Sequence, residues 1–521
     1  MKNADFKYGI DQLDVKTAYG LATGQYKGVL TTVAIDKINK SREAVAHMVA
    51  ADATVYGITT GFGILANTKI NTEDAALLQY KILQSHSVGV GKPVPQLIAK
   101  LMMITKVHAL AQGFSGVQQS TIDRILWHID NDVIPVVPEK GSVGASGDLA
   151  PLAHLFLPLI GMGEVLYKGE RQPAKRVLKD FHLAPIALGP KEGLALINGT
   201  QFILAFAVVA VQRMQNCLDA ADVIGAMSLE ALTGTKAPFD ERLHGIRPFA
   251  GNQLVAQRLR LLLHQSQIMQ SHMDCGRVQD PYSLRCMPQV HGASRTAWLH
   301  LKTLTEIELN AVTDNPIVFG EDDTISGGNF HGQPLALPLD YACFAAAEIG
   351  NISDRRCYLL LEGKWGLPTL LMQDVGLNSG FMIPQYTTAA LVTENKTLCF
   401  PASADSIPTS LGQEDHVSMG SISGRKLASI LDNLEAILAI ELMCACQAIE
   451  FRRPLKSSAL LEEAHHFVRQ FVGFAKEDRI FADDINRMTS IIADFSFVDH
   501  VTVFAKDQGI DLYAGFDNFR L

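Results

Sequence analysis

GSVGASGDLAPLAH, the stretch from Gly141 to His154, has three small residues at its centre, Ala145, Ser146 and Gly147. Glycine has no Cβ, so the backbone of such a segment can fold more tightly than other sequences allow. In a tight turn the amide nitrogen of Gly147 can attack the carbonyl of Ala145 and close a five-membered ring. Loss of water there and at the Ser146 hydroxyl would leave an exocyclic methylidene, an electrophile that no ordinary side chain supplies. Taken alone, a cluster of Gly, Ser and Ala is more typical of a plain loop.

The composition describes a globular chain that is long enough for several domains. The 521 residues exceed the size of one hydrophobic core, and length alone predicts about three domain-sized units. Hydrophobic residues make up 48% of the chain and charged residues 19%, which excludes a disordered protein. The net charge of −9 gives a nucleic-acid partner no electrostatic support.

Neither a targeting segment nor a membrane segment is evident. Residues 1–16 carry charges and no continuous apolar run, so a signal peptide is not expected. The longest strongly apolar run, Phe202 to Val211, is too short to span a bilayer. Eight cysteines without a CxxC pair argue against a zinc ribbon or a disulfide scaffold. We therefore expect a cytoplasmic protein.

Helical periodicity dominates the chain. Leu427, Leu431 and Leu438 belong to an apolar stripe with i, i+3/4, i+7 spacing, which is typical of a core seam. Long helices with few turns predict an elongated bundle. The predicted fold is mainly α, with a smaller mixed N-terminal domain over 1–200 that carries the electrophile segment and a long helical bundle over 201–521. In the first domain we expect helices at 33–50, 72–85 (with Asn71 or Thr72 as N-cap), 100–111 and 119–130, and strands and turns at about 164–190.

Two candidate functional residues precede the electrophile segment. Tyr56 opens a loop that three glycines punctuate, and it either packs this loop onto the body or acts as a general base on a mobile loop. Because tyrosine ordinarily titrates near about 10, the second role requires a positive or hydrogen-bonding environment. His86 stands where a helix gives way to a glycine loop, and a lone histidine in such a place is more often structural.

Three further candidates follow the segment, each with an ordinary alternative. Asn198 stands before a long apolar run, where it is expected to cap the next helix. Arg285 has a planar fork that matches a carboxylate, although a surface ion pair is the simpler reading. Glu414 lies in an E-D-H cluster that reads as a polar first turn of the following helix. A metal site is not supported there, because the chain has neither an H-E-x-x-H motif nor a carboxylate triad.

Taken together, six strings resemble the aromatic amino acid ammonia-lyases, and among these the histidine ammonia-lyases. The agreement covers roughly Tyr56 to Ser457, and the strings occur in the family's order. Their joint occurrence outweighs the alternative for each string alone. The strings are YGITTGFG (56–63), GSVGASGDLAPLAHL (141–155), EGLALINGT (192–200), QDPYSLR (279–285), SGGNFHG (326–332) and QEDHVSMG (413–420).

The resemblance implies a prosthetic group and a set of site residues. Ala145, Ser146 and Gly147 would form a 4-methylidene-imidazol-5-one (MIO), with no external cofactor and no metal. The resemblance further implies that Asn198 stabilises the MIO, that Tyr56 removes a substrate β-proton and that Arg285 binds the substrate carboxylate. Gln279 and Tyr282 would line the site and assist proton transfer. Phe330 would pack against the MIO.

The substrate expectation depends on two places. Ser85-His86 resembles the histidine-specific pattern, although some tyrosine enzymes of the family share it. Glu414 stands where the members specific for phenylalanine and tyrosine typically have glutamine. An imidazole N–H needs an acceptor, whereas a phenyl ring would leave the carboxylate unpaired at a cost of about 1–3 kcal/mol or more. Two departures from the histidine pattern, Gly412 for asparagine and Phe400 for histidine, affect packing near the substrate ring.

The resemblance therefore implies elimination of ammonia from L-histidine to give trans-urocanate. It also implies a homotetramer whose active sites combine residues of three chains. Alternatives within the family are a phenylalanine or tyrosine ammonia-lyase, an aminomutase, and a lyase of a histidine derivative such as a betaine. A non-catalytic structural relative is a further alternative, but it would have no reason to retain Tyr56, Ser146, Asn198 and Arg285 together.

Overall fold

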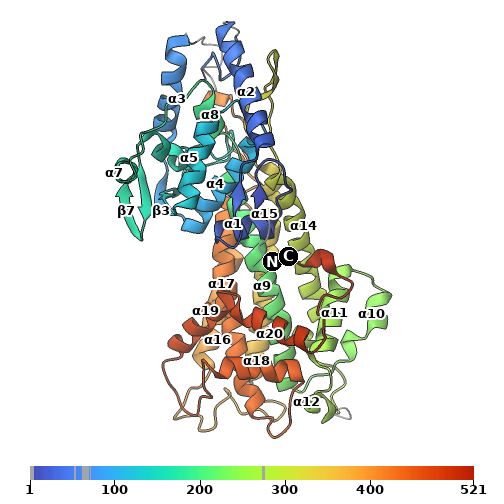
Figure 1. Cartoon of the computed structure of the whole chain (residues 1–521). Coiled ribbons are helices and arrows are strands. Elements are labelled where there is room, and N and C mark those ends of the chain that lie inside the picture. The colour runs from blue at the N-terminus through green and yellow to red at the C-terminus, as the bar shows by residue number, and fades with distance from the viewer. Residues whose placement is uncertain (1–4, 52–53, 62–69, 71, 273–275) are drawn as a thin grey trace. The chain divides into compact units, whose positions relative to one another are not determined.

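The structure is a computed structural model that describes residues 5–51, 54–61, 70, 72–272 and 276–521. Helices make up most of it and strands are few and short, so the predicted mainly α fold is confirmed (Figure 1). Asn71, the alternative N-cap, lies outside the described residues, as do the last two residues of the 56–63 string.

Two compact units make up the chain. Unit 1 comprises 1–209, 301–340 and 401–425, and unit 2 comprises 210–300, 341–400 and 426–521. The expected division at residue 200 is a single cut, whereas these units are discontinuous. Two later segments return to unit 1, and they carry the strings SGGNFHG and QEDHVSMG. Parts of the candidate site that are far apart in sequence therefore share one unit.

Unit 1 mixes helices with short strands. Its strands form two pairs besides the three-stranded sheet β4-β6-β7 and the hairpin β8-β9. β1 pairs parallel with β2, and β3 antiparallel with β5. The helices are α1 (Val15–Ala22), α2 (Thr32–Ala50), α3 (Thr72–His86), α4 (Gln96–Leu110), α5 (Gln119–Asp130), α6 (Leu149–Phe156), α7 (Ala174–Asp180) and α8 (Glu192–Ile197). The strands are β1 (Phe6–Lys7), β2 (Gly28–Val29), β3 (Val90–Pro93), β4 (Ile134–Pro135), β5 (Pro138–Lys140), β6 (Glu164–Tyr167), β7 (Glu170–Pro173), β8 (Ile317–Gly320) and β9 (Asp323–Ile325).

Three helices of unit 1 pack pairwise against one another, namely α3, α6 and α8. Each has a candidate residue at one end. His86 is the last residue of α3, Gly147 lies just before the N-cap of α6, and Asn198 is the C-cap residue of α8. The mutual packing of the three helices therefore brings these three sequence-distant positions into one region of unit 1.

The predicted helices of the N-terminal region agree with the observed ones to within a few residues. The bounds of α5 are those predicted, α2 begins one residue earlier, and α4 begins at Gln96 instead of residue 100. The region 164–190 has the expected strands β6 and β7, but it also contains the short helix α7, which the prediction missed. α7 begins directly after Pro173, the last residue of β7. Proline is as typical of a turn as of a helix start, so the sequence did not distinguish the two here.

His128 on α5 is expected to make unit 1 less stable in acid. Its Nδ1 is 2.8 Å from the carbonyl oxygen of Val133, and its Nε2 is buried without a hydrogen-bond partner among the described residues. Burial lowers the pKa of His128 from 6.5 to about 4. The unfolded state therefore binds more protons between these values, so stability falls as the pH drops through that window, by about 3 kcal/mol at most. His128→Gln should flatten the pH dependence of the urea midpoint between pH 7 and 5; an unchanged slope would contradict this.

Unit 2 is built from helices, and α9, α14, α15 and α17 each have residues in both units. The predicted stripe is confirmed as core, since Leu427, Leu431 and Leu438 on α17 are all fully buried. The helices are α9 (Gln201–Ala231), α10 (Glu241–Gly245), α11 (Ala250–Leu262), α12 (Gln267–Gln270), α13 (Tyr282–Arg285), α14 (Met287–Leu309), α15 (Gln333–Leu361), α16 (Met382–Leu398), α17 (Gly420–Glu450), α18 (Ala459–Arg469), α19 (Phe481–Ala493) and α20 (Ser496–Asp507).

Helix α9 is long and apolar enough to cross a membrane by length and composition alone. However, 83% of its most apolar window is buried inside the protein, which is the pattern of a core helix.

Candidate functional site

The backbone around Ser146 has a conformation that few residues adopt. Ser146 has φ +52°, and Gly144 and Gly147 on either side have φ +80° and +81°. A positive φ is uncommon for a residue with a Cβ, and such strain persists only where the surroundings impose it. A Cβ added to Gly147 would lie 2.2 Å from the carbonyl oxygen of Gly199, so only glycine fits there.

A second segment of unit 1 holds this turn from the other side. The amide of Met419 donates to the carbonyl oxygen of Val143 at 2.9 Å, and the Ser421 hydroxyl donates to the carbonyl oxygen of Ser142 at 2.7 Å. A Cβ on Gly144 would lie 2.1 Å from Ser418 Oγ. The glycines of the motif therefore allow close approach of two neighbouring segments.

Asn198 contacts the central residue of the motif directly. It is 3% exposed, and its Nδ2 donates to the carbonyl oxygen of Ser146 at 3.0 Å. Its Oδ1 is buried and has no hydrogen-bond partner among the described residues. The expectation that Asn198 caps the helix after it is wrong, because it is the C-cap residue of α8 and its amide group serves the Ser146 turn.

Asp148 caps α9 in its place. One carboxylate oxygen accepts from the amides of Phe202 and Ile203 at 3.1 and 3.0 Å. Burial raises the pKa of Asp148 to about 7, although these bonds and the Ser142 hydroxyl partly offset the rise. Sequence reasoning missed this residue, because more than fifty positions separate it from the helix that it caps. The structure thus ties the segment after Gly147 to the start of α9.

Glu414 lies beside the hydroxyl of the motif. Ser146 Oγ donates to Glu414 Oε1 at 2.9 Å, and Thr409 Oγ1 donates to Glu414 Oε2 at 3.0 Å. The backbones of Thr409 and Glu414 also pair as an antiparallel bridge, which fixes the position of the glutamate. The prediction placed both residues at the site, but the sequence did not indicate that they touch.

A cavity of about 390 Å³ in unit 1 brings five of the predicted residues together with Ala145. These five are Tyr56, Ser146, Asn198, Phe330 and Glu414. The cavity is also lined by residues that the prediction did not include, although most belong to the quoted strings: Leu194, Asn315, Ser326, Gly327, His331, Gln413, Asp415 and His416.

His331 and His416 are the most informative of the missed residues. Their rings are stacked, with centroids 5.8 Å apart and planes 5° apart. His331 Nδ1 accepts from the amide of Gln333, and its Nε2 lies 3.2 Å from the carbonyl oxygen of His416. The two histidines lie in the strings SGGNFHG and QEDHVSMG, but only the fold reveals that they meet. The pair joins the loop of Phe330 to the loop of Glu414.

His86 lines a neighbouring cavity of about 290 Å³, and Ala145 and Gly147 line that cavity too. Ser85 Oγ lies 3.0 Å from His86 Nδ1. Burial lowers the pKa of His86, while a bond to the Ile82 carbonyl and the charge of Glu414 partly offset this. The lowered pKa favours the neutral form of His86, in which one ring nitrogen donates and the other can accept a hydrogen bond.

The three remaining candidates, Gln279, Tyr282 and Arg285, belong to unit 2. Gln279 is exposed, and Tyr282 is 71% exposed. The guanidinium of Arg285 lies over the Tyr282 ring, 4.5 Å from its centroid. Arg285 Nε is buried and has no hydrogen-bond partner within the described part of the chain.

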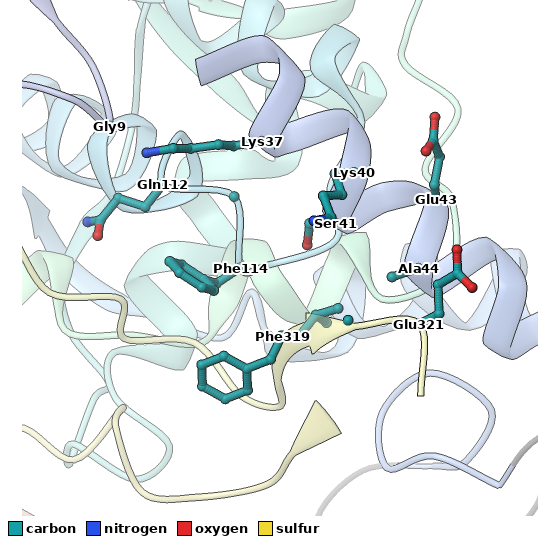
Figure 2. A pocket seen from close by; sticks show the side chains of 13 residues that line it. Gly9, Lys37, Lys40, Ser41, Glu43, Ala44, Gln112, Phe114, Phe319 and Glu321 are labelled. Atoms are coloured by element: carbon teal, nitrogen blue, oxygen red, sulfur yellow. The ribbon is translucent and has the colours of Figure 1, made fainter. Parts of the chain in front are cut away.

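A further cavity of unit 1, of about 300 Å³, contains none of the candidates (Figure 2). Phe114 and Phe319 pack edge to face in it, with centroids 5.8 Å apart. Lysines and glutamates both line it, among them Lys37 and Glu321, so its charge favours no one class of ligand.

Comparisons with known proteins show which family this chain resembles. The model of the family described as aromatic amino acid lyase matches residues 13–470. A histidine ammonia-lyase of Natranaerobius thermophilus is 45% identical over 475 residues, which cover 91% of this chain and 94% of the relative. The crystal structure of a histidine ammonia-lyase from Trypanosoma cruzi is 39% identical and has a TM-score of 0.90, covering 99% of this chain and 98% of its own.

A tyrosine aminomutase from Streptomyces globisporus has the same fold, with a TM-score of 0.92 at 32% identity over 98% of this chain and 100% of its own. Lyases and an aminomutase thus share the architecture, and the fold alone does not separate their reactions. A family match over most of the chain and high identity to full-length relatives lead to one conclusion. The chain belongs to the aromatic amino acid lyase family.

Proposed function

We propose that this enzyme is a carbon–nitrogen lyase that eliminates ammonia from L-histidine to give trans-urocanate and uses an MIO made from Ala145, Ser146 and Gly147. The observation that carries the proposal is the contact between Ser146 Oγ and Glu414 Oε1 at 2.9 Å, which places a carboxylate beside the residue that becomes the electrophile. The relatives named histidine ammonia-lyase support the choice of substrate.

The residues around Ser146 suit formation of the MIO. The Gly147 nitrogen bonds to the Ala145 carbonyl carbon, and that oxygen leaves as water with the amide protons of Gly147 and Ser146. The Ser146 hydroxyl leaves as a second water with the proton on its Cα. The positive φ angles of Ser146 and Gly147 bend the chain tightly, and the donor of Asn198 is already on the Ser146 carbonyl oxygen. The unsatisfied Oδ1 of Asn198 adds a free acceptor at the same place.

The MIO supplies an electrophile that turns the amino group of the substrate into a better leaving group. Dehydration also removes the Ser146 hydroxyl, so Glu414 Oε1 loses its donor and becomes free to accept from a substrate imidazole N–H. Thr409 still holds the other carboxylate oxygen in place. Tyr56 lines the same cavity and takes the β-proton.

The substrate carboxylate is assigned to Arg285, with Gln279 and Tyr282 beside it. Because these residues are not among those that line the cavity of Tyr56 and Ser146, we propose that chains of a homotetramer contribute them to one another's sites. Large exposed apolar side chains on α15 and α16 support such an assembly, since an interface between chains would remove them from water. They include Tyr341, Phe344, Tyr358, Ile383 and Tyr386. A cytoplasmic location is part of the same proposal.

Product formation from L-histidine, L-phenylalanine and L-tyrosine tests the proposal. Ultraviolet absorbance would follow the conjugated acid, and an ammonia assay would run in parallel. Urocanate from histidine alone, with one ammonia for each urocanate, is the expected result. An amino acid product without ammonia would identify an aminomutase instead, as in the S. globisporus relative.

Glu414→Gln is expected to lower kcat/KM for histidine by about 10–100-fold, because a hydrogen bond to a charged acceptor contributes about 1.5–3 kcal/mol. Preference for histidine over phenylalanine should fall with it. Glu321→Gln is the matched control, since it neutralises a carboxylate of the same unit in the cavity of Figure 2. Unchanged discrimination in Glu414→Gln would exclude the glutamate as the imidazole acceptor.

A further inference from the structure

Lys106 is a buried lysine on α4 whose ammonium group meets the end of α8. The residue is 1% exposed, and Nζ donates to the carbonyl oxygens of Ala195 at 3.0 Å and Asn198 at 2.7 Å. The last carbonyls of a helix lack partners within the helix, and a cation is favourable there. A charge is costly to bury unless its bonds are satisfied, so the contacts of this lysine are specific ones.

The turn that Lys106 holds is the one that contacts the tripeptide. Asn198 Nδ2 donates to the Ser146 carbonyl oxygen at 3.0 Å, and the amide of Asp148 donates to the Gly199 carbonyl oxygen at 2.8 Å. Gly147 and Gly199 also form a parallel bridge. The ammonium therefore supports one side of the turn, while the tripeptide contacts the other.

We propose that Lys106 is a positioning residue that holds the Asn198–Gly199 turn against Ala145–Gly147 and so accelerates dehydration of the tripeptide to the MIO. The inference rests on the proposed function, since it requires that the two waters described above are lost. Lys106 exchanges no atom in that reaction. It fixes the donor of Asn198 on the Ser146 carbonyl oxygen and keeps the backbone near Gly147 in its strained turn.

Opposing influences act on the pKa of Lys106. Burial lowers the pKa of Lys106 to about 7, Asp314 and Asp148 act to raise it, and Lys191 lowers it further. Lys191 differs in its contacts, because its Nζ pairs with Asp314 at 2.7 Å and donates to the Ser115 carbonyl oxygen at 2.9 Å. It stands at the N-cap of α8, the end opposite to the Asn198 turn. Lys191 is therefore a matched buried lysine without the proposed task.

The test compares Lys106→Met, Lys106→Gln and Lys191→Met by intact mass at intervals after cell-free synthesis, with circular dichroism to verify folding. We expect the Lys106→Met chain to lose the two waters of MIO formation at least about tenfold more slowly than the unsubstituted chain. Lys106→Gln retains a neutral donor and should be intermediate. Lys191→Met should be destabilised by loss of its ion pair yet dehydrate at the rate of the unsubstituted chain.

A second arm tests whether Lys106 acts through the turn. In an Asn198→Ala background, adding Lys106→Met should slow dehydration by a smaller factor than it does in the unsubstituted chain, because the side-chain donor that Lys106 positions is already absent. The inference is overturned if folded Lys106→Met matures at the normal rate, if Lys191→Met is slowed equally, or if neither Lys106 variant folds. An unsubstituted chain that never loses two waters would instead refute the proposed function, so the two failures are distinguishable.

Discussion

Ser146→Ala is expected to leave the chain at its full unmodified mass and to lower kcat/KM for histidine by about 10³-fold or more. The substitution removes the oxygen that must leave as the second water, so no methylidene can form. It also removes the donor to Glu414 Oε1 at 2.9 Å, a loss that water can replace in the cavity. Folding should therefore survive while the electrophile does not.

The measurement is intact mass together with urocanate absorbance. Ser41→Ala is a suitable control, because Ser41 is a buried serine of unit 1 that accepts from the Gly116 amide at 2.9 Å. That variant should lose some stability but still shed two waters. A Ser146→Ala enzyme with the activity of the unsubstituted chain would refute both the MIO and the proposed reaction.

Local strings were sufficient to single out six of the residues that line the cavity in unit 1, namely Tyr56, Ala145, Ser146, Asn198, Phe330 and Glu414. Each of these residues lies in a stretch whose composition is unusual for its position, such as the small residues at 144–147 or the glutamate at 414. The mainly α fold could likewise be predicted, since hydrophobic periodicity reports which face of a helix is buried. These features depend on neighbours along the chain.

What the sequence could not predict are contacts between distant segments. Asp148 caps α9, and Lys106 binds the end of α8 about 90 residues further on. Neither an aspartate at the start of one helix nor a lysine within another carries a local sign of its distant partner. The discontinuous units have the same cause, because α14, α15 and α17 each have residues in both units, so that segments distant in sequence share unit 1.

The stacked histidines illustrate the same limit at the site itself. His331 and His416 are 85 positions apart and each stands in a polar loop, where a histidine is usually unremarkable. Only their packing reveals that they join the Phe330 loop to the Glu414 loop. Membership of a motif is thus easier to predict than the contact that one motif makes with another.

Tyr56→Phe is expected to lower kcat for histidine by about 10²–10⁴-fold, the usual contribution of a positioned general base. The ring still fills its place in the cavity with Phe330, so KM should change little and the chain should still lose two waters. This combination separates proton removal from formation of the electrophile, which Ser146→Ala cannot do.

Tyr80→Phe provides the control for loss of a tyrosine hydroxyl from the same unit. Tyr80 on α3 donates to the Ile186 carbonyl oxygen at 2.9 Å and accepts from the Leu188 amide at 3.3 Å, so its hydroxyl is structural. Its removal should cost about 1 kcal/mol of stability and leave kcat nearly unchanged. If Tyr56→Phe loses less than tenfold in kcat, another group must take the β-proton. If the rate of water loss from the tripeptide falls together with kcat, Tyr56 would instead be assigned to formation of the electrophile.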